Sequence, residues 1–322
     1  MKEVSFIRQN IEKWKSLEKT VDKAASHNPG ELADAYTDIT TDLSFSRSHY
    51  PESRITVYLN NLASALHNQL YKNKKEKYSR IITFWTREIP DVMYRSRKEL
   101  LYSFLIFITS VIIGVLSAIN DDSFARLIMG NGYIDMTLRN IENGNPMGVY
   151  GTESELPMFL YLIFNNIRVS FIVFALGIFS GFGTGFALFR NGVMLGAFQT
   201  FFFQYGVGFE SMLAIWLHGT LEISAIVIAG AAGLALGNGW LFPGTYSRRY
   251  AFLQGAKRGL KIVTGLVPVF LAAGFIEGFM TRHTEYPTYI RLSVILLSLA
   301  FIIFYYLVLP QIRHNGIHKT KN

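Results

Sequence analysis

A histidine and a glutamate stand four residues apart in an otherwise apolar stretch of this chain. They are His218 and Glu222, in the sequence Trp-Leu-His-Gly-Thr-Leu-Glu-Ile that begins at residue 216. In a helix this spacing places both side chains on one face, about one turn apart. The stretch is long and apolar enough to cross a bilayer, where an ionisable side chain is costly and usually functional. The pair therefore predicts a polar site inside a membrane.

Three kinds of chemistry fit this pair. As metal ligands, His218 and Glu222 need at least one more donor, for which Glu210 and Glu277 are the candidates. As a proton relay or a substrate-binding pair, they line a water-filled cavity. As a structural lock, they bond to each other and to polar groups on neighbouring helices. The polar groups available on other segments are those of Asn165, Asn166, Arg168, Asn191 and Gln199.

Signatures of the common enzyme classes are missing from the sequence. It contains no His-Glu-x-x-His sequence, no Gly-x-Ser-x-Gly elbow and no phosphate-binding loop of the Walker type. It also contains no cysteine, which excludes disulfides, thiol catalysis and cysteine-ligated metals. These absences favour a protein without enzymatic activity, and the sequence identifies no cofactor.

The composition indicates a membrane protein. Of the 322 residues 50% are hydrophobic and 17% are charged, a mixture that fits a multi-pass membrane protein with one polar region. The formal net charge is +8, but the basic residues lie beside apolar segments. Retention of those residues on the cytoplasmic side explains the charge better than binding to nucleic acid. We therefore expect the bilayer, and no nucleic acid, as a partner.

The chain divides into three expected regions. Residues 1–98 predict an amphipathic helical domain, whose basic segment 72–98 either lies on the membrane surface or packs on its own domain. Residues 99–310 predict an all-α membrane domain, and residues 311–322 a basic tail. A turn at Arg190-Asn191-Gly192 separates two of the spans. About six spans are expected, over residues 100–119, 169–189, 193–209, 212–238, 262–280 and 291–309.

The charges around these spans predict an orientation. Basic residues flank the first span at 95–98, recur at Arg190, dominate 247–261 and close the chain. With six spans, the positive-inside rule places all four of these segments in the cytoplasm. The acidic loop 120–157 then lies outside. We therefore expect both termini in the cytoplasm.

Small residues recur at intervals of four positions within two of the spans. Such rows let helix backbones approach closely, so they predict tight packing between helices and make a homodimer plausible. The glycines in these rows are Gly177, Gly181, Gly185, Gly233 and Gly237.

Several sequence blocks carry a resemblance to a known family. They are residues 165–168, 174–181, 191–196, 218–233 and 272–279, of which the block His-Gly-Thr-Leu-Glu from His218 is the most specific. Together they resemble the stage II sporulation protein M family, over roughly residues 50–280. The resemblance implies that His218, Glu222 and Glu277 are motif positions. The additional N-terminal domain departs from the sporulation namesake and indicates the branch of the family outside sporulation.

The resemblance also implies a role, because the namesake is a membrane scaffold that holds cell-wall hydrolases during engulfment. We expect an integral scaffold of a bacterial inner membrane that assembles envelope or cell-wall-associated proteins. An alternative from a different class is a transporter or channel with its site at His218 and Glu222. A third alternative is an intramembrane metal-dependent enzyme.

Overall fold

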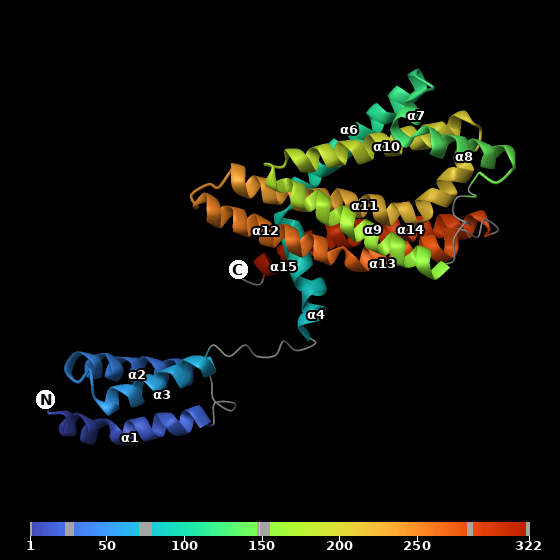
Figure 1. Ribbon diagram of the computed structural model, residues 1–322. Coiled ribbons are helices and arrows are strands. Elements are labelled where there is room, and N and C mark those ends of the chain that lie inside the picture. The colour runs from blue at the N-terminus through green and yellow to red at the C-terminus, as the bar shows by residue number, and fades with distance from the viewer. Residues whose placement is uncertain are drawn as a thin grey trace. The chain divides into compact units, whose positions relative to one another are not determined.

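The computed structural model describes residues 2–22, 29–70, 79–146, 148, 155–281 and 286–319. No strand occurs among these residues, and helices account for nearly all of them (Figure 1). The expected all-α class is therefore confirmed. The chain forms two compact units, Met1–Arg80 and Ile81–Asn322, which are described separately. Outside the described residues lie 1, 23–28, 71–78, 147, 149–154, 282–285 and 320–322, which include parts of the expected N-terminal domain, outer loop and basic tail.

The N-terminal unit contains the helices α1 (Glu3–Asp22), α2 (Pro29–His49) and α3 (Arg54–Leu70). Pro29 opens α2, at a position where its missing N–H removes no helical hydrogen bond. The apolar faces of the three helices meet in one core. Its fully buried side chains include those of Trp14, Ile39, Leu59 and Leu66.

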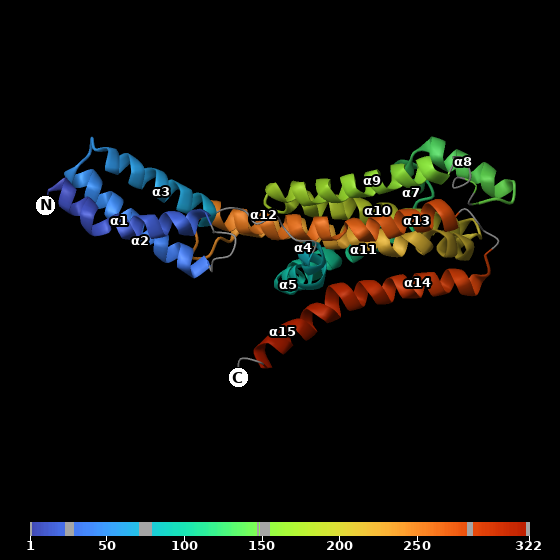
Figure 2. The ribbon, with the colours of Figure 1, turned by 90° about the horizontal axis from the view of Figure 1, so that it is seen from below.

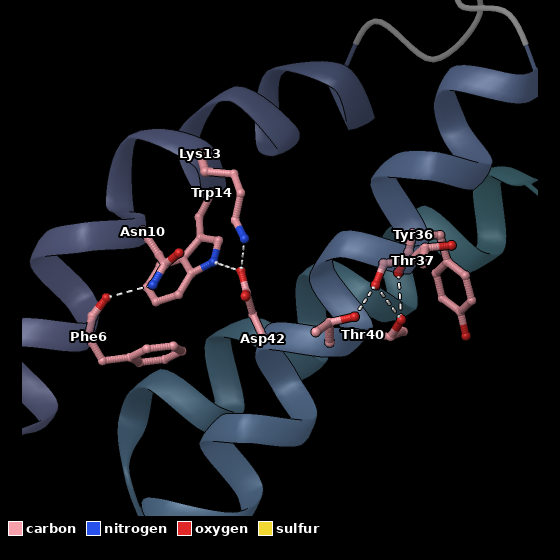
Figure 3. A network of polar contacts seen from close by, with 9 residues as sticks. Phe6, Asn10, Lys13, Trp14, Tyr36, Thr37, Thr40 and Asp42 are labelled. Carbon is pink, nitrogen blue, oxygen red and sulfur yellow. Dashed lines mark hydrogen bonds and ion pairs between the residues drawn. The ribbon is translucent and has the colours of Figure 1, made fainter. Parts of the chain in front are cut away.

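A polar contact ties α1 to α2 inside this unit (Figure 3). The indole Nε1 of Trp14 donates to Oδ2 of Asp42 over 2.7 Å, and Lys13 forms an ion pair with the same carboxylate. A buried indole generally needs such an acceptor, because its N–H would otherwise lose its hydrogen bond to water. The ring of Phe6 packs against the indole with its centroid 5.3 Å away. Asp42 thus fixes the position of the largest core side chain.

Five described segments of the second unit are long and apolar enough to cross a membrane, which confirms the expected polytopic membrane protein. They comprise α6 (Arg97–Asn120), α9 (Glu155–Ala175) with η4 (Leu176–Ile178), α11 (Gly208–Leu241), α12 (Arg248–Gly265) with α13 (Val267–Ile276) and η5 (Glu277–Thr281), and α14 (Thr288–Ile303) with η6 (Phe304–Val308) and α15 (Leu309–Lys319).

A further long helix, α10 (Phe182–Gln204), is not one of these five segments. It carries Arg190 and Asn191 near its middle. It lies side by side with α6 (Figure 1). A Cβ added to Gly196 would lie 2.3 Å from the carbonyl oxygen of Val111, and one added to Gly192 would meet Phe107 and Ser110. The prediction of a turn at Arg190-Asn191-Gly192 is therefore wrong. These residues lie inside α10, and Gly192 lets α10 approach α6 closely.

The actual break between the helices lies ten residues earlier. Ser180 and Gly181 have φ values of 56° and 77°, the left-handed conformation that ends η4 and starts α10. This break replaces the expected division into spans 169–189 and 193–209.

Helix α11 is the centre of the membrane unit, with α9 and α14 along opposite sides of it (Figure 2). It contacts α6, α9, α10, α12, α13 and α14. Its 34 residues correspond to about 51 Å of helix, well beyond the ~30 Å of a hydrocarbon core. Small residues make this crowding feasible, and Ala225, Ala229 and Ala232 are completely buried.

Part of the expected outer loop is helical. It contains α7 (Phe124–Met129) and α8 (Asn131–Glu142), joined by an Arg126–Asp135 ion pair of 2.6 Å. Ala125 and Ile134 pack with side chains of α10 and α11 in a small separate core. The helical pair is therefore seated on one end of those two helices.

The segment that begins at the unit boundary comprises α4 (Ser79–Thr83), which crosses the boundary, η2 (Phe84–Glu88) and α5 (Ile89–Arg95). The indole of Trp85 donates to the carbonyl of Gly265 over 3.3 Å, and the hydroxyl of Tyr305 donates to the carbonyl of Trp85 over 2.6 Å. Lys261 and Glu88 form an ion pair of 2.6 Å. From Ile81 onward the segment is thus part of the membrane unit.

Candidate functional site

Three ionisable side chains meet inside the membrane unit, and we call them the polar cluster: His218 and Glu222 of α11 and Glu277 of η5. One ligand atom from each side chain lies within 4.8 Å of the others. The two α11 residues share a face because they stand four positions apart. His218 and Glu277 are buried, with exposed fractions of 5% and 7%.

Glu277 enters the polar cluster from a π-helical turn. The segment η5 is a π-helix of five residues, a rare geometry that is often found at functional sites. Its first and last residues, Glu277 and Thr281, both contact the imidazole of His218. Nδ1 of His218 lies 3.0 Å from Oγ1 of Thr281, and Nε2 lies 3.7 Å from Oε1 of Glu277.

The hydrogen-bond network assigns a tautomer to His218. We assign the Nδ1–H of the imidazole as the donor to Oγ1 of Thr281, since the Thr281 hydroxyl has its own acceptor in the carbonyl of Ile276 at 3.3 Å. Nε2 then carries the lone pair and faces Glu277. This orientation is the one in which an imidazole accepts a proton from a carboxyl group or binds a metal.

Asn166 of α9 completes the surroundings, since its side-chain amide donates to Oε1 of Glu222. Among the described residues, no Lys or Arg forms an ion pair with Glu222 or Glu277. Two carboxylates this close, one of them buried and the other half-buried, repel each other unless a proton or a cation lies between them. The polar cluster is therefore suited to hold a proton or a metal ion, or to lock α11 to α9 and η5.

The family model described as Stage II sporulation protein M matches residues 103–282. The chain belongs to this family. The match covers more than half of the chain and includes Asn166, Thr281 and the whole polar cluster, so the resemblance seen in the sequence is confirmed. Residues 4–72 match a second model, Domain of unknown function (DUF8413), over the three helices of the N-terminal unit. No curated protein and no solved structure matches the chain.

Most of the other polar residues that the sequence offered as partners lie away from the polar cluster. Asn165, Arg168 and Glu210 are exposed. Asn191 donates to the carbonyl of Ala187, one turn back in α10. Gln199 bonds to Ser211 and Trp216. Among the contacts of the described residues, only Asn166 of this group reaches the cluster.

Glycines of this family member hold α9 and α10 against α11. A Cβ added to Gly177 would lie 2.1 Å from the carbonyl oxygen of Gly233, and one added to Gly237 would lie 2.4 Å from the backbone N of Gly181. Gly185 differs, because a Cβ there meets nothing within 4 Å. The Gly177–Gly233 contact therefore holds the backbone of η4, directly after α9, against α11.

Proposed function

We propose that this family member is an integral membrane scaffold that gathers envelope or cell-wall-associated proteins. One observation carries the proposal: the N-terminal unit has its own closed core and its own family match, and contributes no residue to the polar cluster. Such a unit is suited to binding another protein, while the membrane unit anchors it.

The packing of the membrane unit supports an anchor. Backbones touch at Gly114 against Val193, at Gly177 against Gly233 and at Gly255 against Ala235, where an added Cβ would lie between 2.1 and 2.6 Å from a carbonyl oxygen. Helices in such contact cannot slide without losing their close fit. A rigid body of this kind suits a scaffold better than a protein whose helices rearrange at each turnover.

The proposal includes an orientation in the bacterial inner membrane, with both termini in the cytoplasm. Arg97 and Lys98 open α6, and Arg248 and Arg249 open α12. At the opposite end of α6, Asp121 and Asp122 lead into α7 and α8. Basic residues remain on the cytoplasmic face of bacterial membranes, which favours this direction.

The placement of α10 is part of the same proposal. Its first turn lies beside the last part of α11, where Gly181 meets Gly237. Its far end packs with the first part of α11, where Phe201 and Phe202 join Ala214 in one core. Helix α10 therefore runs antiparallel to α11 along residues 214–237, as a sixth crossing would.

Co-purification tests the scaffold role. The full chain and a chain lacking residues 2–70 are expressed at matched levels and extracted from native membranes in mild detergent. We expect stoichiometric protein partners with the full chain and their loss from the shortened one. A full chain that purifies with no partner beyond itself would contradict the proposal.

A second candidate, a transporter or channel, is favoured by the polar cluster itself, since ionisable groups in spans often mark solute or proton pathways. In this case the protein alone, reconstituted in liposomes, moves a solute or protons. Glu222→Gln abolishes that movement, whereas Glu99→Gln, at a buried glutamate outside the cluster, preserves it. Unchanged flux in Glu222→Gln would remove the basis of this candidate.

A further inference from the structure

We propose that the polar cluster binds one divalent ion of a first-row transition metal, such as Zn²⁺ or Mn²⁺. Such an ion site is separate from the scaffold role and can be filled whether or not the protein has partners. Its donor set consists of one imidazole nitrogen and two carboxylate oxygens from two helical segments, α11 and η5.

The distances between the donors are close to those of a metal site. Ligand atoms at about 2.0–2.2 Å from a common ion lie at most about 4.4 Å from one another. The donor atoms of the polar cluster lie within 4.8 Å, and Nε2 of His218 lies 3.7 Å from Oε1 of Glu277. Neighbouring ligands of a tetrahedral ion lie about 3.5 Å apart, so side-chain rotations that move the donor atoms by about 1 Å bring all three onto one ion.

Two neighbouring residues hold the donor side chains in place by hydrogen bonds. A metal-binding imidazole generally donates its other N–H to an oxygen, which fixes the ring and its tautomer. Thr281 supplies that oxygen to Nδ1 of His218, so Nε2 faces Glu277. Asn166 holds Oε1 of Glu222 in the same way. Two of the three donors are thus oriented before any ion arrives.

The charge of the polar cluster favours a divalent cation. Glu222 and Glu277 together carry two negative charges when ionised, and among the described residues no Lys or Arg pairs with them. One divalent ion neutralises both charges. Burial makes this compensation necessary, because an uncompensated carboxylate inside a membrane is strongly unfavourable.

The donor types narrow the choice of ion. Imidazole suits zinc, iron, copper and nickel, whereas carboxylate suits magnesium, calcium and manganese. One nitrogen and two oxygens match the preferences of both groups of metals in part. Zn²⁺ and Mn²⁺ are therefore the probes of choice, and Co²⁺ adds an absorption spectrum that reports its ligands. An ion bound here joins α11 to η5 across the inside of the unit.

The test measures metal content. The full chain is purified in detergent through a tag without histidines, stripped with a chelator, incubated with Zn²⁺ or Mn²⁺ and desalted. We expect about one bound ion per chain by elemental analysis. His218→Ala, Glu222→Gln and Glu277→Gln each lose it. The control Glu99→Gln removes another buried glutamate, one that contacts Arg258 and Asn238, and keeps the ion.

Wild-type protein decides the question even where a variant fails to fold. Added Zn²⁺ or Mn²⁺ raises the melting temperature of stripped wild-type protein, since an ion that binds only the folded state stabilises it. Co²⁺ gives a visible spectrum that Zn²⁺ displaces. Wild-type protein that binds none of the three ions overturns the proposal and identifies the cluster as a proton-sharing lock. Equal binding by wild type and all variants overturns it too, because the ion then lies elsewhere.

Discussion

The hydroxyl of Thr281 orients the imidazole of His218, and its loss has a measurable consequence. Thr281→Val keeps the shape of the side chain but leaves a buried Nδ1–H without this acceptor. We expect a loss of about 1–3 kcal/mol of stability, the usual cost of an unsatisfied buried donor. Thr281→Ser retains the oxygen and melts close to wild type. Thermal unfolding in detergent, followed by tryptophan fluorescence, distinguishes the two; equal melting of Thr281→Val and wild type would show that the hydroxyl does not hold the ring.

At the same scale, the spacing of His218 and Glu222 predicted a shared helix face, and Glu277 stood out as an acid in an apolar span. Thr281 gave no such signal. It lies 63 residues after His218, and threonines are common in membrane helices. Its role arises from the π-helical turn of η5, which brings both of its ends to one imidazole. No local periodicity encodes that geometry.

At the scale of elements, backbone contact holds η4, directly after α9, against α11. Gly177→Ala places a methyl group 2.1 Å from the carbonyl oxygen of Gly233, so the helices must separate. We expect a loss of about 1–3 kcal/mol or more, as for other overpacked sites. Gly185→Ala is the matched control, because that position is open and alanine favours a helix by about 1 kcal/mol over glycine. Detergent melting curves measure both, and equal stability of the two variants contradicts the packing argument.

The helix boundaries show where sequence patterns mislead. Arg190-Asn191-Gly192 combines a charge, an amide and a glycine, which is typical of a turn. In the structure Gly192 lets α10 approach α6, while the break lies at Ser180 and Gly181. The same residue type thus serves close packing at one site and a left-handed turn at the other. Only the neighbouring helix, which the local sequence does not specify, distinguishes the two roles.

At the scale of the whole molecule, the N-terminal unit has the properties of an independent domain. We expect a fragment of residues 1–80 to give a helical circular dichroism spectrum and to unfold cooperatively, because its core is closed within Met1–Arg80. Trp14 is the one tryptophan of that fragment and reports its unfolding. Trp14→Ala lowers stability by about 3–5 kcal/mol, whereas Val4→Ala, at a position 70% exposed, has little effect. A disordered fragment would contradict the division into two units.

The number of crossings and their direction decide on which side each surface of the protein is displayed. The chain has no cysteine, so single cysteines at Asn143, after α8, and at Ser247, before α12, give unique and exposed labels. Helices α9, α10 and α11 lie between the two positions. If α10 crosses, the labels lie on opposite faces of the membrane; if it does not, they lie on the same face.

We expect a membrane-impermeant maleimide to label Asn143→Cys in right-side-out vesicles, and Ser247→Cys only after permeabilisation. This outcome follows from the basic start of α12 and the antiparallel packing of α10 on α11. Labelling of both positions from one side would mean that α10 stays within one face of the bilayer. The reverse pattern would place the N-terminal unit outside the cell, and with it the partners of the proposed scaffold.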